Sequence, residues 1–253
     1  SAYRVFIVRR IYRLIPAYVS CLLVFALVAS IFAPDSRVLH NQYLLWTLTA
    51  NIESSFGDRG ALGDGTFSMV HFWSLALEWH FYILFPLVFR LSRTPTNAAI
   101  ILVFVAIVCR LIFFALGMSD NAVYSFTYCR IDSLAFGVLL SAWSPKLHTK
   151  ASKRVGVLGV FLLALLLLIL ANSGWRFKTL EWLQLFGYSA ISASVAMFLL
   201  WILNAPQNSL IIMALEVNWL VVIVSLSYSL YIWHLVFFPF LLNVVRNNID
   251  GIS

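Results

Sequence analysis

Long apolar runs separated by short polar segments make up most of this chain, and each run is about as long as a helix that crosses a bilayer. About 20 apolar residues in a helix span the ~30 Å hydrocarbon core. The pattern therefore predicts an all-α, polytopic transmembrane helix bundle with about seven spans, forming one membrane-embedded domain over residues 1–253. The predicted spans are 14–33, 72–91, 98–117, 124–143, 155–171, 182–203 and about 220–245.

Composition supports the membrane assignment. Apolar residues make up 62% of the 253 residues and charged residues only 11%, far from the values of a soluble domain. The net charge of +7 would suggest a nucleic-acid partner in a soluble protein. Here the basic residues lie at the ends of the apolar runs, so membrane topology accounts for them and we expect no nucleic acid to bind.

The distribution of basic residues predicts the orientation, because cytoplasmic loops of membrane proteins are enriched in Lys and Arg. If the seven spans alternate, ten basic residues fall on one side, which we take as cytoplasmic, and the loop 34–71 falls on the other. The apolar piece 43–50 of that loop is too short to cross and is expected to lie in the interface or to re-enter. The ten residues are Arg4, Arg9, Arg10, Arg13, Arg90, Arg93, Lys146, Lys150, Lys153 and Arg154.

Three arginines before the first span form the first candidate site. Arg9, Arg10 and Arg13 fall close together if the segment is helical. Guanidinium groups bind phosphate oxygens in a fork-like, bidentate manner, so the cluster is suited to a phosphate-bearing ligand. Anchoring of the helix end among lipid headgroups would need the same residues, and the sequence leaves both possibilities open.

The segment from His71 to Tyr82 reads HFWSLALEWHFY and places one carboxylate and two imidazoles in an apolar run. A charged side chain at that depth is costly unless it is paired or lines a polar cavity. On a helix His71, Ser74, Glu78 and Tyr82 share one face, whereas His80 points to another side. The alternative is a protonated Glu78 that only holds helices together by a hydrogen bond.

Further charged residues occur in the third and fourth predicted spans. Arg130 and Asp132 are two residues apart, so on a helix they face different directions and each should meet a group on another span. Arg130 and Glu78 are a natural pair at similar depth, and an interhelical ion pair of purely structural value is the alternative. Arg110 stands alone in the sequence, and we expect a structural role for it.

The last predicted span carries a polar stripe of Ser227, Tyr231 and His234. Histidine is the usual proton-transfer residue near neutral pH, which makes His234 a candidate for chemistry. A core imidazole that bonds a neighbouring helix is the alternative. Pro239 is expected to bend the span beyond the stripe.

The cysteines and the short motifs exclude several classes of site. Cys21, Cys109 and Cys129 are isolated along the chain, and the sequence has no CxxC or HExxH pattern. We therefore expect neither a disulfide framework nor a metal site. The absence of a Walker or GxGxxG loop argues against nucleotide-binding motifs of those types.

Taken together, the four segments resemble the acyltransferase-3 family of bacterial membrane proteins, which acylate cell-surface glycans. Arg9, Arg10 and Arg13 with Pro16 are similar to its basic segment, and HFWSLALEWHFY matches its WSLxxExxFY block. Arg130, Asp132 and Gly137 resemble its RxDxxxxG block, and residues 227–234 its SYxxYxxH block. The blocks occur in the family's order through nearly all of the chain.

The resemblance implies a reaction and roles for residues. Acyl-CoA, often acetyl-CoA, would be the cytoplasmic donor substrate, with no permanently bound cofactor. The hydroxyl of an extracytoplasmic glycan or glycolipid would be the acceptor, and the protein would lie in the bacterial inner membrane. Glu78, Tyr231 and His234 would be catalytic, and Arg9, Arg10 and Arg13 would bind the donor. Substrate-binding residues would be His71, Trp73, Ser74, Tyr82, Arg130, Asp132 and Tyr228.

One departure from the family pattern leaves other functions open. Family members begin with a span that carries a basic residue and the histidine regarded as catalytic, and we expect that span to precede Ser1. The chain would then be N-terminally incomplete and either active only in a longer protein or a non-catalytic remnant. A proton-coupled transporter or flippase of lipid-linked sugars is a further alternative, because intramembrane Glu, Asp and His also serve proton relays.

Overall fold

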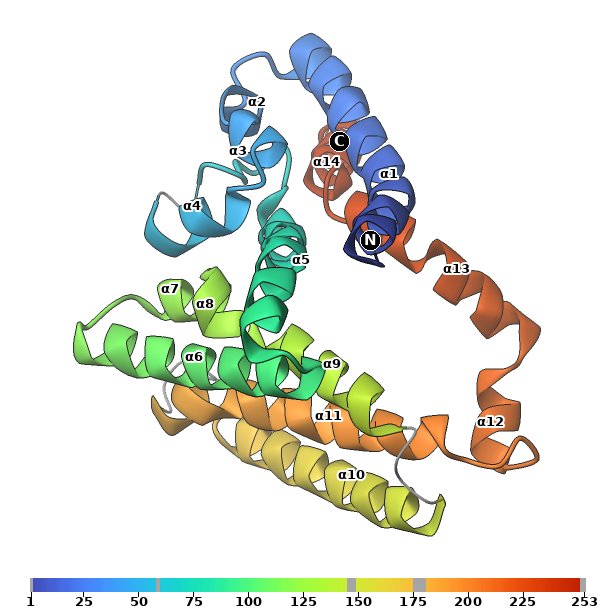
Figure 1. The fold of residues 1–253 in the computed structure, drawn as a ribbon. Helices are drawn as coiled ribbons and strands as arrows, with labels where there is room; N and C mark the ends of the chain where they lie inside the picture. The colour runs from blue at the N-terminus through green and yellow to red at the C-terminus, as the bar shows by residue number, and fades with distance from the viewer. Residues whose placement is uncertain (1, 58–59, 145–148, 175–180, 251–253) are drawn as a thin grey trace. The chain divides into compact units, whose positions relative to one another are not determined.

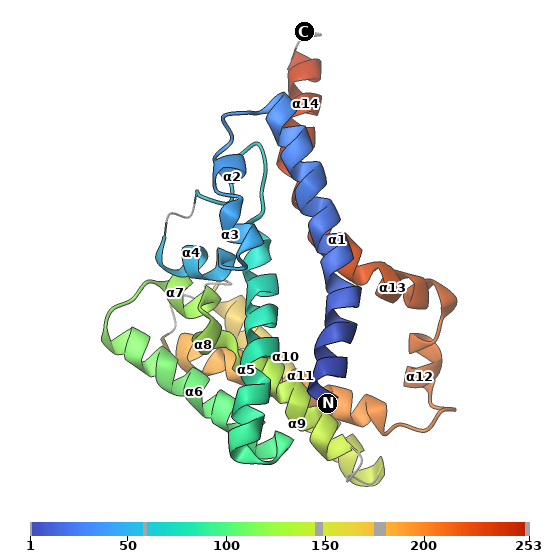
Figure 2. The same cartoon turned by 45° about the horizontal axis from the view of Figure 1, so that its top comes forward.

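The computed structural model describes residues 2–57, 60–144, 149–174 and 181–250 and is helical nearly throughout. In these ranges the only β-type pairing is an isolated bridge between Gly63 and Ser68. The predicted all-α class is therefore confirmed. The chain divides into two compact units, residues 1–79 with 219–253 and residues 80–218, and the boundary falls inside helix α5 (Figures 1 and 2).

The first unit is built on one long helix at the start of the chain. Its core is a row of aromatic contacts: the rings of Tyr18 and Phe72 are 5.4 Å apart, those of Phe25 and Phe67 5.3 Å. Its elements are α1 (Ala2–Phe32), α2 (Arg37–His40), α3 (Tyr43–Trp46), α4 (Ala50–Phe56), a 3₁₀ turn (Val70–Phe72), the start of α5 (Trp73–Ser92), α13 (Asn218–Trp233) and α14 (Phe238–Asp250).

Helices α13 and α14 are two halves of one apolar segment, bent by 70° at residues 234–237. The bend lies just before Pro239, which occupies the first turn of α14, where a missing backbone N–H does not break the helix. The predicted bend is confirmed, slightly earlier than expected. Asn243 connects α14 to the loop 34–71 by donating to the Gly65 carbonyl at 3.1 Å.

The second unit is a stack of helices around α6, in which α6 packs on α9 and α11 packs along α10. Thr94 begins α6 by accepting a hydrogen bond from the Asn97 amide at 3.1 Å, with Pro95 in the first helical position. Its elements are α6 (Pro95–Ala115), α7 (Asp120–Ser125), α8 (Thr127–Arg130), α9 (Asp132–Trp143), α10 (Thr149–Asn172), a π-helical turn (Leu183–Gly187), α11 (Tyr188–Leu203) and α12 (Leu210–Leu215).

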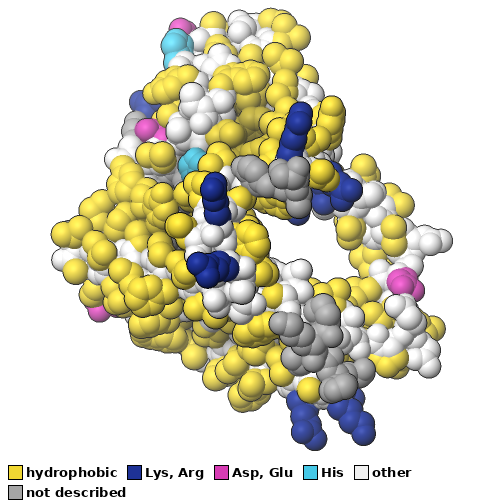
Figure 3. Space-filling view, in the orientation of Figure 1, with side chains coloured by type: hydrophobic (Ala, Val, Ile, Leu, Met, Phe, Trp, Pro, Cys, Tyr) yellow, Lys and Arg dark blue, Asp and Glu magenta, His cyan; other side chains and the backbone are white. Residues whose placement is uncertain are grey.

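Among the described residues, five helices are long and apolar enough to cross a membrane, and the bent pair α13–α14 makes a possible sixth. The predicted stretch 124–143 is not one helix: the chain is extended at Phe126, and the longest continuous helix there, α9, has 12 residues. Figure 3 shows hydrophobic side chains over much of the visible surface, as lipid-facing helices require. The five spans are Arg4–Phe32, Val70–Ser92, Pro95–Ala115, Lys150–Asn172 and Leu183–Leu203.

Candidate active site

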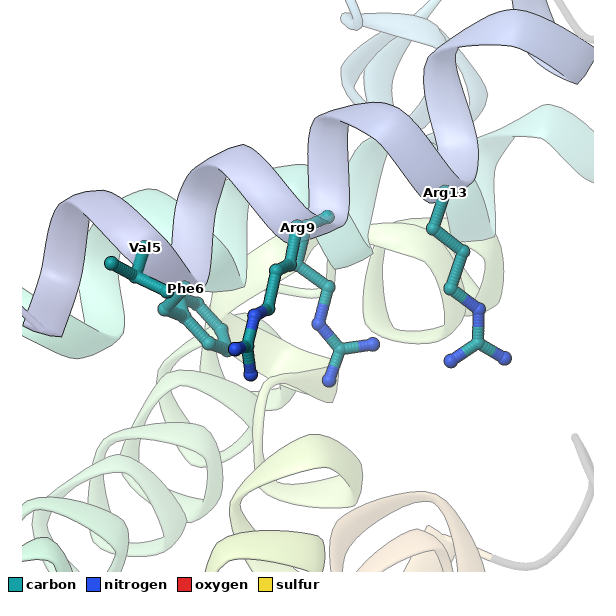
Figure 4. A pocket seen from close by; sticks show the side chains of 5 residues that line it. Val5, Phe6, Arg9 and Arg13 are labelled. Atoms are coloured by element: carbon teal, nitrogen blue, oxygen red, sulfur yellow. The ribbon is translucent and has the colours of Figure 1, made fainter.

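The three N-terminal arginines line one pocket on α1. The guanidinium groups of Arg9 and Arg13 extend from the same side of the helix (Figure 4), and Arg10, Val5 and Phe6 complete the pocket of about 390 Å³. The Arg10 guanidinium lies over the Phe6 ring at 5.5 Å from its centre. Arg9 and Arg13 are exposed, so the pocket is an open cluster of positive charge, as the helical spacing predicted.

The second candidate site joins the start of α5 to the end of α13. The Tyr231 hydroxyl donates to the His71 carbonyl at 3.1 Å and contacts the Ser74 hydroxyl, which also donates to that carbonyl at 3.0 Å. The imidazole rings of His71 and His234 lie 4.9 Å apart, and the Tyr231 ring lies 5.4 Å from His71. Four predicted site residues, His71, Ser74, Tyr231 and His234, thus form one histidine–tyrosine cluster.

Backbone carbonyls fix the tautomers of the two imidazoles in this cluster. The Nδ1 atom of His234 lies 2.7 Å from the Tyr231 carbonyl oxygen, which can only accept. In neutral His234 the proton is therefore on Nδ1, and Nε2 carries a lone pair. His71 is the reverse: Nε2 donates to the Ile232 carbonyl at 3.1 Å, and Nδ1 is a buried atom to which no described group hydrogen-bonds.

Glu78 and Tyr228 lie beside this cluster on the same two helices. Glu78 is half-buried, one helical turn beyond Ser74, and within electrostatic range of the Tyr228 hydroxyl. Tyr228 donates to the Leu14 carbonyl of α1 at 3.0 Å. Because Leu14 directly follows Arg13, this hydrogen bond connects the helix of the arginine pocket to the helix that carries Tyr231.

Asp132 has a partner on another helix, as predicted, and the partner is Arg110. Two guanidinium nitrogens of Arg110 lie 3.0 Å from one carboxylate oxygen of Asp132, and both side chains are fully buried. Ser189 donates to the same carboxylate oxygen at 2.5 Å. The expectation that Arg110 stands alone is wrong, because α6 and α9 pack together and bring these distant residues into contact.

Arg110 also satisfies a backbone carbonyl near the break between α7 and α9. Arg110 also donates to the Cys129 carbonyl at 2.8 Å, close to where the helix is interrupted. An unsatisfied backbone carbonyl at membrane depth is costly, so a broken helix there needs such a partner. Arg110 therefore has the expected structural role, with a specific target.

Arg130 packs against two neighbouring tyrosine rings, with its guanidinium carbon 4.1 Å from the ring centre of Tyr188 and 5.6 Å from that of Tyr124. Cation–π contacts of this kind stabilise a positive charge where water is scarce. The pairing of Arg130 with Glu78 stays a prediction, since the two residues belong to different units.

The remaining predicted residues have diverse surroundings. Tyr82 is buried, with its ring 6.3 Å from that of Phe81, and Trp73 is half-buried at the start of α5. His80 contacts the Thr127 hydroxyl at 2.7 Å, which confirms that it points away from the Ser74 face. Lys146, one of the ten basic residues used for orientation, lies outside the described residues.

Sequence reasoning missed Ser189, Tyr188, Tyr124 and the partner of Asp132. The usable signal was weak: Arg110 and Asp132 are opposite charges in neighbouring apolar segments, each expensive unless paired. Cys109 and Cys129, isolated along the chain, have their sulfur atoms 3.3 Å apart as free thiols. Nothing in the local sequence indicates either contact.

Comparison with known proteins identifies the family. Residues 1–252 match the family described as an acyltransferase domain, Acyl_transf_3. The chain belongs to the acyltransferase-3 family. It is 29% identical over 251 residues to O-acetyltransferase OatA of Staphylococcus aureus strain NCTC 8325, covering 89% of this chain. It is also 29% identical over 253 residues to the putative O-acetyltransferase SACOL0978 of S. aureus strain COL, covering 90%.

These matches concern only part of each relative. The chain spans about two fifths of the length of the curated relatives: 39% of OatA and 40% of SACOL0978. No solved structure matches the chain significantly. Family membership and the apolar helices together establish a multi-pass membrane protein of an acyltransferase family.

Proposed function

We propose that this chain is the membrane-embedded part of an O-acetyltransferase of the bacterial inner membrane. It would move an acetyl group from cytoplasmic acetyl-CoA to a hydroxyl of an extracytoplasmic glycan or glycolipid. Family membership and the printed activity of the relatives support the reaction class. The observation that carries the proposal is the pair of sites in the first unit, an arginine pocket and a histidine–tyrosine cluster on connected helices.

The depths of the two sites suit a donor that enters from one side. Arg9 to Arg13 lie near the start of the span Arg4–Phe32. Phe72 contacts both His71 and Tyr18, which brings the histidine level with the middle of that span. Tyr18 is five residues beyond Arg13, a rise of about 7.5 Å. The phosphates of coenzyme A would bind the arginines while its extended arm carries the thioester to the imidazoles.

The neutral tautomer of His234 suits it to accept a proton. In place of the histidine expected before Ser1, the Nε2 lone pair of His234 would take the proton of the acceptor hydroxyl as the oxygen attacks the thioester carbonyl. The resulting tetrahedral oxyanion collapses, the C–S bond breaks, and the coenzyme A thiolate takes the proton back from His234. Proton transfer by a positioned group contributes roughly 10²–10⁴-fold to such rates.

The neighbouring hydroxyls and the carboxylate would act around this step. The Tyr231 and Ser74 hydroxyls both donate to the His71 carbonyl in the structure. During the reaction they would turn to donate to the oxyanion, and such donors can raise the rate by roughly 10²–10³-fold. Glu78 would stabilise the imidazolium that forms. Trp73 and Tyr228, together with Tyr82, Arg130 and Asp132 of the second unit, stay proposed as substrate-binding or cavity-forming residues.

The test is acetyl transfer from radiolabelled acetyl-CoA in membrane vesicles that contain the natural full-length protein. His234→Gln and Glu78→Gln should each lower transfer by about 10²-fold or more without reducing the amount of inserted protein. Arg10→Ala with Arg13→Ala should raise KM for acetyl-CoA and leave kcat nearly unchanged, because the arginines bind the part of the donor that does not react.

Two outcomes would contradict the proposal. Wild-type rates in both His234→Gln and Glu78→Gln would remove the assigned cluster from catalysis. Translocation of an unmodified lipid-linked sugar, with no label passing from the donor, would indicate a transporter instead. An unchanged KM in the double arginine variant would leave these arginines as membrane anchors. Ser227→Ala, on the same helix with its hydroxyl bonded to the Val224 carbonyl, is the matched control.

A further inference from the structure

Two arginines of the second unit differ in how their hydrogen-bonding groups are used. Arg110 donates to the Asp132 carboxylate, the Cys129 carbonyl and the Ser189 hydroxyl. Arg130 has its face covered by Tyr188 and Tyr124 but makes no hydrogen bond in the described part of the chain, and its Nε atom is buried without a partner. The two rings pack against the guanidinium group, and its N–H groups make no hydrogen bond within the described residues.

Arg130 also has no carboxylate of its own at ion-pair distance within the described residues. Its closest interacting carboxylate, Asp132, already pairs with Arg110, so two cations share one anion. Asp120 accepts a hydrogen bond from Gln184 at 3.0 Å, and within the described ranges no carboxylate lies at ion-pair distance from Arg130. A partly buried guanidinium that makes no hydrogen bond within the described residues is suited to bind an oxyanion.

The surroundings of Arg130 favour a saccharide as the carrier of that oxyanion. Tyr124 and Tyr128 are each 41% exposed and present ring surface on which the apolar face of a sugar can stack. The Asp120–Gln184 pair beside them, from α7 and the π-helical turn, offers groups that bind hydroxyls. The cluster lies near the carboxyl end of α6, since Phe126 stacks on Phe113 at 5.2 Å. That end is extracytoplasmic in the predicted orientation.

We propose that Arg130, framed by Tyr124 and Tyr188, binds the carboxylate of an acidic sugar in the glycan acceptor. This assignment rests on the proposed function and narrows its acceptor to a negatively charged saccharide. Two N–H groups of the guanidinium edge meet the two carboxylate oxygens, and the sugar ring stacks on the exposed face of Tyr124. A neutral sugar of the same shape keeps the stacking and loses the ion pair.

The experiment measures equilibrium binding by calorimetry to the full-length protein in phosphatidylcholine nanodiscs. The probes are trigalacturonate and its methyl ester, which has the same rings without charge. Wild-type protein should bind trigalacturonate at least about tenfold more tightly than the ester, because a charge-assisted bidentate pair is lost. Arg130→Gln should abolish that preference, and Arg130→Lys should restore only part of it because lysine lacks the planar fork.

Controls separate recognition from folding and from lipid binding. Arg90→Gln removes an exposed cation elsewhere and should change nothing, whereas Tyr124→Ala keeps the charge and should weaken both probes equally. Equal affinity for acid and ester in wild type, or an unchanged preference in Arg130→Gln, overturns the proposal. In phosphatidylglycerol nanodiscs at high salt, which screens the surface charge, wild type should keep its preference for the acid over the ester; disappearance of that preference overturns the proposal, because an anionic headgroup then occupies Arg130. Acetyl transfer is assayed separately, so failure of the catalytic proposal would not mimic either result.

Discussion

Arg110 and Arg130 lie in apolar helices of the same unit, and their burial is compensated in different ways. Arg110 is compensated by a carboxylate and a backbone carbonyl, and Arg130 by aromatic faces. A buried ion pair is not in itself strongly stabilising, because desolvation offsets the attraction. Removing one member is a different matter, since it leaves an uncompensated charge. At the residue scale, the ion pair therefore determines which helices contact each other and adds little to the stability of that contact.

This predicts the outcome of a double-mutant cycle at the ion pair. Asp132→Ala should destabilise the protein by about 3–5 kcal/mol, because Arg110 keeps its charge in a fully buried position. Arg110→Met with Asp132→Leu should recover much of that loss, since neither charge remains. Unfolding in mild detergent, followed by circular dichroism, measures both. A double variant as unstable as Asp132→Ala would show that the pair is not what the single substitution disrupts.

Close packing between elements is clearest where α10 crosses α11. A Cβ atom on Gly159 would lie 2.7 Å from the Ser194 carbonyl oxygen and 2.8 Å from the Met197 Cβ, closer than real contacts. Small residues let transmembrane helices approach in this way, and packing then holds them together. The glycine is thus required by the neighbouring backbone and not by its own conformation.

Alanine substitutions at two helical glycines should distinguish the effect of close helix packing from that of helix propensity. Gly159→Ala should destabilise the protein by about 1–3 kcal/mol through overpacking. Gly137→Ala in α9 meets nothing within 4 Å and should be neutral or stabilising by up to about 1 kcal/mol, because alanine favours a helix. Thermal unfolding of both variants in the same detergent provides the comparison. Equal destabilisation would mean that α10 and α11 are not packed at Gly159.

In the loop 34–71, Asp64 is expected to make the stability of the fold depend on pH. Partial burial raises the pKa of Asp64, but hydrogen bonds from the Ser36 hydroxyl and the amides of Phe67 and Thr66 outweigh it and lower the pKa below its usual value. A carboxylate with a lowered folded-state pKa stabilises the fold above its unfolded pKa of about 3.9. That contribution is lost as the pH falls through the folded value.

The resulting prediction compares wild type with Asp64→Asn. The wild-type midpoint of thermal unfolding should fall between about pH 4 and the lower folded pKa, and the variant should lack this part of the decline. Above about pH 5 the variant should be the less stable of the two, since it loses the charge-assisted bonds. Parallel pH profiles would show that Asp64 carries no such linkage.

At the element scale, many of the helices and some of their contacts could be predicted from the sequence. Run lengths predicted the long helices, and helical spacing predicted that His71 and Ser74 share a face, now seen to meet Tyr231. The helix break at Phe126 could not be predicted, because no Pro or Gly marks it and the residues around it remain apolar. Arg110 satisfies the Cys129 carbonyl three residues further on, from another helix, and such a tertiary partner has no local signature.

For the whole molecule, the spans and the basic residues define a topology that can be measured. The outer loop 34–71 and the turn after α6 should share one side, and the turn between α5 and α6, next to Arg93, the other. This arrangement underlies the proposed entry of donor and acceptor from opposite faces.

Single cysteines at exposed positions test that topology. Asp35→Cys and Leu116→Cys should react with a membrane-impermeant maleimide in intact cells, whereas Asn97→Cys should react only after the cells are broken. The unsubstituted chain reports the background from its native cysteines. Reaction of Asp35→Cys and Asn97→Cys from the same side would exclude α5 as a span, and complete reversal would invert the assigned orientation.

The π-helical turn at Leu183–Gly187 makes the spacing of this segment critical. A π turn holds roughly one residue more than an α turn, so deleting a single residue there would convert it to regular helix. Because the turn already absorbs the extra residue, the helix on either side would keep about the same orientation, and the change would fall on the turn itself. Gln184 would leave Asp120, although Ser189 could keep its place against Asp132. A one-residue deletion in this segment should therefore cost mainly the Gln184–Asp120 hydrogen bond, whereas a further insertion would rotate the flanking side chains by about 100° and should be more damaging.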